Sequence, residues 1–220
     1  MPFTLFVIGN IASGKSTACS YLARSGARHL DLDVIAKSLY VPGSAIVDSI
    51  AEAFGWDVLD ESGEVRSSVL AQRVFVDEDS VRRLNEIVHP VLLDYLSNIL
   101  LPVPCCSLVV PTPALTVVEI SAPASFTDAF GLADEVIAIT APLNTRRARA
   151  IERGMSGSDF DARSDLQPSE DELKMMADTV IDNSVADDTL FRSLDLWLED
   201  RGIRLADGKR PQDPSWTPIG

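Results

Sequence analysis

Residues 9–17 read Gly-Asn-Ile-Ala-Ser-Gly-Lys-Ser-Thr, a complete G-x-x-x-x-G-K-[ST] phosphate-binding pattern. The apolar run at 3–8 is typical of a buried strand, and residues 18–24 read as a helix. Glycines let the backbone turn tightly, so that its N–H groups face phosphate oxygens, and a helix N-terminus favours an anion. The sequence therefore predicts a nucleoside triphosphate site.

This loop also predicts which residues contact the nucleotide. Lys15 has the reach to contact the β- and γ-phosphates, and the Ser16 hydroxyl is expected to ligate Mg²⁺. ATP and Mg²⁺ are thus the expected cofactors. The predicted nucleotide contacts in the loop are Ala12, Ser13, Gly14, Lys15, Ser16 and Thr17.

Composition narrows the class of protein. With 220 residues, 46% of them hydrophobic, the chain suits one α/β domain with an inserted lid. No apolar run reaches the roughly 18 residues of a membrane span, and no basic leader precedes the first strand, so a cytoplasmic protein without a membrane partner is expected. The net charge of −14 argues against a nucleic-acid partner. The three cysteines, Cys19, Cys105 and Cys106, show no metal-ligand spacing along the sequence.

The order of predicted elements indicates the architecture. Besides residues 3–8, strands are expected at 29–33, 115–120, 135–140 and 179–181. Helices are expected at 34–54 with a break at Pro42-Gly43, then at 68–76, 79–98, 144–154, 170–177 and 187–201. Ser44 is the expected N-cap of the helix that resumes at residue 45. The polar segment from 155 to 165 is predicted to be flexible, and the prolines in 101–115 favour a loop or an edge feature.

Strands that alternate with helices predict an α/β fold, a P-loop NTPase three-layer sandwich with a parallel sheet. The predicted kinase domain covers residues 1–200. It contains a helical substrate-binding subdomain at about 60–100 and a lid at about 144–168. Residues 201–220 are expected to form a flexible tail.

Two carboxylates, Asp31 and Asp33, stand at the end of the second predicted strand. Their spacing in a strand would direct both side chains to one face. Ligands of an open parallel sheet lie beyond the carboxyl ends of its strands, where the phosphate loop also lies. One carboxylate there could accept the proton of an attacking hydroxyl, or it could simply cap the helix that follows.

Four arginines mark the predicted helix at 144–154: Arg146, Arg147, Arg149 and Arg153. Arginine forks stabilise the charge that builds up during phosphoryl transfer, so this helix is predicted to belong to a lid over ATP. His89 precedes Pro90 in a helical segment, and His29 lies in a strand, where a structural role is expected. Neither histidine has the neighbours that a catalytic triad needs.

Several motifs together resemble the dephospho-coenzyme A kinase family. The phosphate loop is similar to the family's G-G-I-G-S-G-K-S-T, and residues 30–36, Leu-Asp-Leu-Asp-Val-Ile-Ala, match a D-A-D-x-I-A stretch. Pro42-Gly43, Gly63 to Arg66 with Leu70 and Phe75, and residues 87–90 follow in the family's order. The resemblance continues through Arg149, Arg153 and Gln167 to residues 177–183, Ala-Asp-Thr-Val-Ile-Asp-Asn, and covers about residues 3–200.

The resemblance implies a reaction and a role for each matching residue. ATP would phosphorylate the ribose 3′-hydroxyl of a small-molecule substrate, dephospho-coenzyme A, with Asp33 as the base. Lys15, Arg149 and Arg153 would stabilise the migrating phosphoryl group, and Asn183 would lie near the adenine. Arg66 and His89, with Asp31 beside Asp33, would form the acceptor side. The expected assembly is a monomer or a weak homo-oligomer.

The chain also departs from the family pattern. Residues 121–128, Ser-Ala-Pro-Ala-Ser-Phe-Thr-Asp, stand where the family usually carries P-L-L-x-E, and Asn10 and Ala12 replace glycines of the loop. Ala12 is expected to need a negative φ, because a Cβ makes positive φ costly. These departures leave two alternatives: another P-loop kinase acting on a nucleotide, shikimate or a sugar acid, or a divergent, weakly active nucleotide-binding paralogue. No N-K-x-D guanine motif supports a GTPase.

Overall fold

The structure is a computed structural model that describes residues 2–100, 113–185 and 187–205. Its contacts divide the chain into two compact units, Met1–Leu32 with Cys105–Gly220 and Asp33–Pro104. The segment predicted as an acceptor-binding subdomain, 60–100, falls in the second unit. Residues 206–220 of the predicted tail, most of the proline-rich segment, and Cys105 and Cys106 lie outside the described residues.

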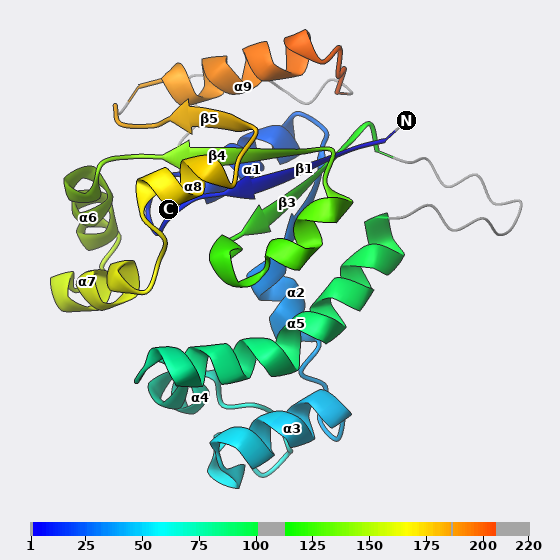
Figure 1. Cartoon of the computed structure of the whole chain (residues 1–220), viewed down its shortest axis with the longest axis vertical. Coiled ribbons are helices and arrows are strands. Elements are labelled where there is room, and N and C mark those ends of the chain that lie inside the picture. Colours follow the sequence, from blue (N-terminus) through cyan, green and yellow to red (C-terminus); the bar gives the residue numbers. More distant parts are fainter. Residues whose placement is uncertain (1, 101–112, 186, 206–220) are drawn as a thin grey trace, which may run out of the picture. The chain divides into compact units, whose positions relative to one another are not determined.

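A five-stranded parallel sheet forms the centre of the first unit, as predicted (Figure 1). Its strands stand in the order β2-β3-β1-β4-β5, which places β1 between β3 and β4. Strands β2 and β3 lie on one side of β1, and strands β4 and β5 lie on the other, so the strand order changes side there. Such a switch point is where α/β sheets bind ligands. The phosphate loop follows β1 directly. The strand bounds are β1 Phe3–Ile8, β2 Arg28–Asp31, β3 Leu115–Ile120, β4 Glu135–Thr140 and β5 Thr179–Asp182.

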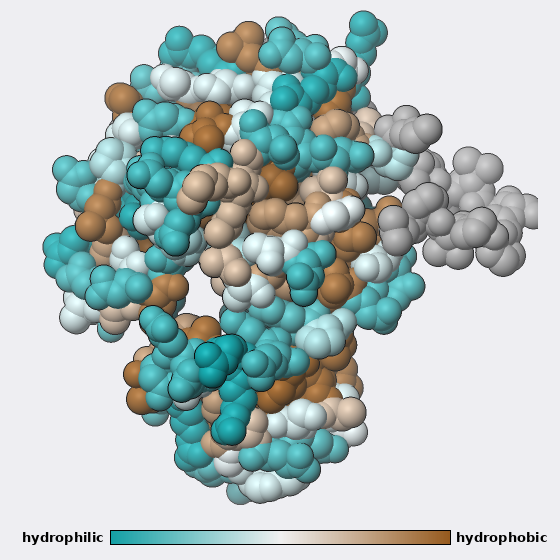
Figure 2. All heavy atoms as spheres, viewed as in Figure 1, coloured by the Kyte–Doolittle hydropathy of each residue, from teal (hydrophilic) through white to brown (hydrophobic). Residues whose placement is uncertain are grey.

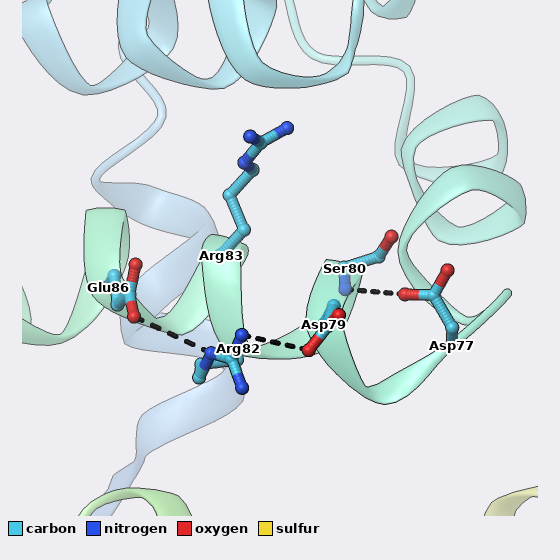
Figure 3. A pocket seen from close by; sticks show the side chains of 6 residues that line it. All are labelled: Asp77, Asp79, Ser80, Arg82, Arg83 and Glu86. Atoms are coloured by element: carbon cyan, nitrogen blue, oxygen red, sulfur yellow. Dashed lines mark hydrogen bonds and ion pairs between the residues drawn. The ribbon is translucent and has the colours of Figure 1, made fainter.

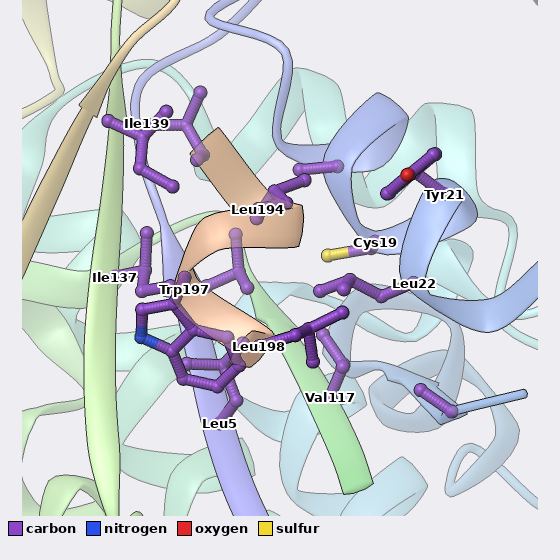
Figure 4. Packing of buried hydrophobic residues seen from close by; sticks show 14 of the residues in the cluster. Leu5, Cys19, Tyr21, Leu22, Val117, Ile137, Ile139, Leu194, Trp197 and Leu198 are labelled. Atoms are coloured by element: carbon purple, nitrogen blue, oxygen red, sulfur yellow. The ribbon is translucent and has the colours of Figure 1, made fainter. Parts of the chain in front are cut away.

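Both faces of β1 are buried, because its side chains alternate between two apolar layers. Leu5 and Val7 join the cluster made with helices α1 (Lys15–Arg24) and α9 (Thr189–Asp200), where Leu194 and Trp197 pack (Figure 4). Phe6 points the other way and meets the ring of Phe130 edge-on, with centroids 6.1 Å apart. The sheet is therefore the middle layer of the first unit.

The stretch that departs from the family pattern has a packing role. Residues Pro123–Ser125 and Thr127–Leu132 form the short 3₁₀ helices η2 and η3 after β3. Pro123, Phe126 and Ala129 are buried. Phe130 adds the ring that covers Phe6, so this stretch contributes to the layer opposite α1 and α9.

The prediction of a flexible segment at 155–165 is wrong for most of its length, because residues 157–165 form helix α7 (Gly157–Asp165). The Ser156 hydroxyl accepts the backbone N–H of Asp159 at 3.1 Å, which satisfies one orphan donor of the first turn. Phe160 is fully buried and anchors this otherwise polar helix. α7 stands between α6 (Leu143–Glu152) and α8 (Glu170–Met175), and α8 begins with a capping box made by Ser169 and Glu172.

The second unit is helical and has its own core. It contains α3 (Ala45–Phe54), η1 (Trp56–Val58), α4 (Ser67–Val74) and α5 (Glu78–Leu100), together with α2 (Leu32–Ser38), which starts at the last residue of the first unit. The break predicted at Pro42-Gly43 is confirmed. Ser44 is the N-cap residue of α3, as predicted, and its side chain makes no capping hydrogen bond. The buried core residues include Val47, Ile50, Ala51, Val58, Leu70, Val74 and Val88.

Hydrophilic side chains cover most of the face seen in Figure 2, with apolar ones interspersed among the described residues. Among those residues, no helix has the length and apolarity needed to cross a membrane.

Glu135, the first residue of β4, links this strand to β5 and to the end of α9. Its carboxylate accepts from Thr179 Oγ1 at 2.7 Å, from Trp197 Nε1 at 2.8 Å, and from the Arg201 guanidinium. Burial alone would raise the pKa of Glu135, but the hydrogen bonds from Arg201, Trp197 and Thr179 outweigh it and lower the pKa. The ionised carboxylate therefore stabilises the folded chain.

We expect Glu135→Gln to lower the free energy of unfolding by about 2 kcal/mol at pH 7, since charged hydrogen bonds are lost. A pKa lowered in the folded state gives stability above the ordinary carboxyl pKa of about 4.3, which is lost as the pH falls through the folded value. Urea unfolding of wild type and variant should therefore converge in acid. The exposed Glu199→Gln is the control, and an equal loss there would contradict this role for Glu135.

Candidate active site

The phosphate loop, residues 9–14, joins β1 to α1 at the carboxyl edge of the sheet (Figure 1). Gly14 has φ 110°, and a Cβ there would overlap the Asn183 amide. At Gly9 a Cβ would lie 2.5 Å from the Ile139 carbonyl oxygen. Both positions need glycine because neighbouring atoms occupy the space that a Cβ would fill. The loop leads directly into the first turn of α1, which presents its backbone N–H groups there.

Ala12 contradicts the expectation of a negative φ. Its φ is 59°, the left-handed region that costs a residue with a Cβ about 1–2 kcal/mol. Among the described residues, Ala12 is the one residue other than glycine with a positive φ. The loop therefore keeps the left-handed turn that a glycine would form there without strain.

We expect Ala12→Gly to raise the free energy of unfolding by about 0.5–1 kcal/mol, because relieved strain exceeds the added freedom of the unfolded chain. Urea denaturation measures this change. The same substitution at exposed Ala148, inside α6, should instead destabilise by about 1 kcal/mol. If both variants lost stability alike, Ala12 would not be strained.

The loop is tied to the segment that follows α7. The Asn10 side chain donates from Nδ2 to the Pro168 carbonyl at 2.8 Å, and Ile11 N–H donates to Gln167 Oε1, also at 2.8 Å. Asn10 has no positive φ, so the backbone does not require glycine there. The asparagine that replaces a family glycine thus makes a hydrogen bond that a glycine could not make.

Lys15 and Ser16 open α1 and face a buried carboxylate. Ser16 Oγ donates to Glu119 Oε1 at 2.6 Å, and His29 Nε2 lies 3.2 Å from Glu119 Oε2. Lys15 is buried, with Nζ 3.3 Å from the Asn10 carbonyl oxygen. Burial opposes ionisation of Glu119, but the bonds from His29 and Ser16 and the charge of Lys15 lower its pKa overall. The carboxylate is therefore ionised beside the loop.

Glu119 is a site residue that the sequence analysis did not select. It is the charged residue in the otherwise uncharged run of β3, Leu-Thr-Val-Val-Glu-Ile, and every residue of that strand is buried. A buried carboxylate needs hydrogen-bond partners, so a lone acid in a core strand next to a phosphate loop was the available signal.

The end of β5 also meets the loop. Asn183 donates from Nδ2 to the Ser13 carbonyl at 2.7 Å, and its backbone N–H bonds to Thr140. Asn183 therefore contacts the loop itself, and its predicted place near adenine stays a prediction. The charge of the neighbouring Asp182 acts on the Arg149 guanidinium of the predicted lid helix α6, which follows β4.

Buried guanidinium nitrogens on α6 indicate an anion site. Arg149 Nη1 and Arg146 Nη1 are buried without a hydrogen-bond partner among the described residues. Burial lowers the pKa of Arg149, nearby Arg153 lowers it further, and Asp182 opposes both. Arg146 lies over the Phe160 ring and donates from Nε to the Ala141 carbonyl at 3.0 Å. Arg153, at the end of α6, is exposed.

The predicted pairing of Asp31 and Asp33 on one strand face is wrong. Asp31 ends β2, whereas Asp33 lies in the first turn of α2, so strand alternation does not relate their side chains. Asp33 is exposed and belongs to the second unit. Its charge and the burial of the phenol both raise the pKa of Tyr40, with burial the larger cause.

The other predicted acceptor residues also lie in the second unit. Exposed Arg66 precedes α4 and donates from Nε to the Leu59 carbonyl at 3.0 Å, and His89 is half-buried in α5. A hollow at the start of α5 contains neither of them (Figure 3). Arg82 there pairs with Asp79 and Glu86, so its charge is already compensated.

Comparison with known proteins identifies the family of this chain. A family model described as dephospho-CoA kinase matches residues 4–188. The chain belongs to the dephospho-CoA kinase family. A dephospho-CoA kinase of Corynebacterium diphtheriae is 33% identical over 192 residues, which cover 86% of this chain and 92% of that protein. One of Aquifex aeolicus is 34% identical over 176 residues, covering 80% and 86%.

Solved structures agree on the fold. A Thermus thermophilus protein has a TM-score of 0.70 at 26% identity, covering 90% of this chain and 97% of its own. The dephospho-CoA kinase of Campylobacter jejuni has a TM-score of 0.58 at 21% identity, covering 92% and 99%. Shikimate kinase of Acinetobacter baumannii, at 15% identity and TM-score 0.54, covers 94% and 97% and shares the fold alone. The family match favours a dephospho-CoA kinase over the kinases that act on the alternative acceptors.

Proposed function

We propose that this protein transfers the γ-phosphoryl group of ATP to the ribose 3′-hydroxyl of dephospho-coenzyme A, giving coenzyme A and ADP. The observation that carries the proposal is the family match over residues 4–188, which includes the complete phosphate loop. The structure supports it with a formed loop at the switch point of a parallel sheet and with buried cations beside it.

Residues of the first unit suit the phosphoryl donor. The N–H groups that open α1 and the Lys15 ammonium would hold the phosphates, and the unpartnered Nη1 of Arg149 would bind an oxygen of the migrating group. Arg153 is proposed to assist from the end of α6. Arginine suits this task because its fork binds planar oxyanions and stays charged.

Magnesium fits the oxygen donors at the start of α1. Ser16 Oγ and the ionised Glu119 carboxylate lie 2.6 Å apart and are hard oxygen ligands of the kind Mg²⁺ prefers. Ser16 would contact the ion, and Glu119 would hold it directly or through water. When bound, Mg²⁺ neutralises charge on the nucleotide phosphates.

The acceptor side is proposed to come from carboxylates and basic groups on β2 and the second unit. Asp33 would accept the proton of the attacking 3′-hydroxyl, and Asp31 would orient the acceptor. Arg66 and His89 would bind it. The Asp33 side chain is exposed in the first turn of α2, and a general base must lie within hydrogen-bond reach of the proton that it accepts.

The test is ADP release from purified protein with Mg-ATP, with and without dephospho-coenzyme A. Release that depends on the acceptor supports the proposal, and product analysis should place the new phosphate at the 3′-position. Shikimate and nucleoside monophosphates serve as alternative acceptors. ATP binding without acceptor-dependent release would contradict the proposal and favour a nucleotide-binding paralogue.

We expect Glu119→Gln to weaken the apparent affinity for Mg²⁺ by about 10–100-fold, because the variant keeps the shape but loses the charge beside Ser16. The measurement is the Mg²⁺ dependence of turnover at saturating ATP. Glu199→Gln, exposed on α9, should leave that dependence unchanged. An unaltered Mg²⁺ dependence in Glu119→Gln would remove Glu119 from the metal's surroundings.

A further inference from the structure

We propose that Cys19, His29 and Glu119 form a binding site for Zn²⁺ or a similar borderline divalent metal. The Cys19 sulfur, a nitrogen of His29 and a carboxylate oxygen of Glu119 all lie within 4.8 Å of one another. They come from α1, β2 and β3, so the folded first unit alone assembles them. The site shares Glu119 with the proposed Mg²⁺ position, but it uses the Cys19 thiol and the His29 imidazole in place of the Ser16 hydroxyl.

Sheet register explains why these side chains meet. Asp31 of β2 stands opposite Glu119 of β3, and His29 stands opposite Val117, so alternation puts His29 and Glu119 on one face. Val117 belongs to the cluster packed against α1, which identifies that face. Cys19 points from α1 into the same cluster (Figure 4), one turn after Ser16.

The separation of two of the three ligand atoms fits a tetrahedral metal site. Two ligands with metal bonds of about 2.0–2.1 Å in a tetrahedron are separated by about 3.3–3.4 Å. His29 Nε2 and Glu119 Oε2 are 3.2 Å apart. The Cys19 sulfur lies within 4.8 Å of a ligand atom of each of these two residues, so the third ligand is close to the other two.

The donor set selects the metal. One sulfur, one imidazole nitrogen and one carboxylate oxygen suit Zn²⁺, whereas Mg²⁺ prefers oxygen alone. Three protein ligands leave one position for water. Burial, followed by the charge of Glu119, raises the pKa of the Cys19 thiol, and a metal must displace the thiol proton in order to bind. Asp31 and Glu119 favour a cation there, and Lys15 opposes it.

The test titrates purified full-length protein with Co²⁺, whose bond to a thiolate gives a near-ultraviolet charge-transfer band. The protein is first made as Cys105→Ser/Cys106→Ser, so that Cys19 is the one thiol left in the chain. We expect this variant to show the band with one Co²⁺ per chain and to lose it when Zn²⁺ is added.

Two ligand variants complete the test. Adding Cys19→Ala should abolish the band, and His29→Gln should weaken Co²⁺ binding at least tenfold. His29 is partly exposed, so its variant should fold, and circular dichroism checks both. Absence of the band in the Cys105→Ser/Cys106→Ser protein would overturn the proposal, as would unchanged Co²⁺ affinity in His29→Gln. The measurement is independent of kinase activity.

Discussion

Replacing Lys15 by methionine should slow acceptor-dependent ADP release by about 1,000-fold. Lys15 is buried at the start of α1, where its ammonium lies beside the loop and near ionised Glu119. Removing one preorganised donor from a developing oxyanion typically costs about 10²–10³ in rate, and here a full positive charge is also lost. Methionine retains the length of the side chain, so the effect should come from charge rather than from packing.

The matched control is Lys174→Met in α8. Lys174 is exposed and pairs with Asp171 at 3.2 Å, so its loss should change the rate by less than a factor of two. Thermal unfolding of both variants checks that they are folded, and Lys15→Met should be at least as stable as wild type because a buried charge has been removed. A rate within tenfold of wild type would exclude Lys15 from phosphoryl transfer.

Asp33→Asn should lower kcat by about 10²–10⁴-fold while leaving ATP affinity nearly unchanged. The asparagine keeps the size of the side chain but cannot accept the proton of the 3′-hydroxyl. Turnover and equilibrium binding of ATP are measured in parallel. A loss confined to kcat supports the base role, whereas a loss confined to stability supports a helix-start role.

Asp48 provides a control for the helix-start role. Like Asp33 it is exposed and lies in the first turn of a helix, α3, where its charge stabilises the helix N-terminus by about 0.3–1 kcal/mol. Asp48→Asn should therefore lose similar stability with no loss of kcat. Equal kinetic effects in the two variants would argue that Asp33 acts on the helix and not on the substrate.

Local sequence predicted the elements well where one period dominated. The apolar run at 3–8 formed β1, and the glycines and Lys15 at its end formed the loop. The family motifs led to the dephospho-CoA kinase family, which the comparisons confirmed. Local rules failed at two places. Residues 157–165 read as a polar stretch but form α7, which Ser156 caps and buried Phe160 anchors, and Ala12 has a left-handed φ that its residue type disfavours.

By itself the sequence determined the phosphate loop, the order of strands and helices, and the family, because each depends on residues close together in the chain or on motifs in a fixed order. Tertiary structure alone brought Ser16, His29 and Glu119 together, since that contact depends on which strands become neighbours and in what register. It likewise joined Cys19 to them, although the cysteines show no metal-ligand spacing along the chain. Strand pairing joins segments that are far apart in the chain and depends on the burial of both sheet faces. It therefore cannot be read from the spacing of residues along the sequence.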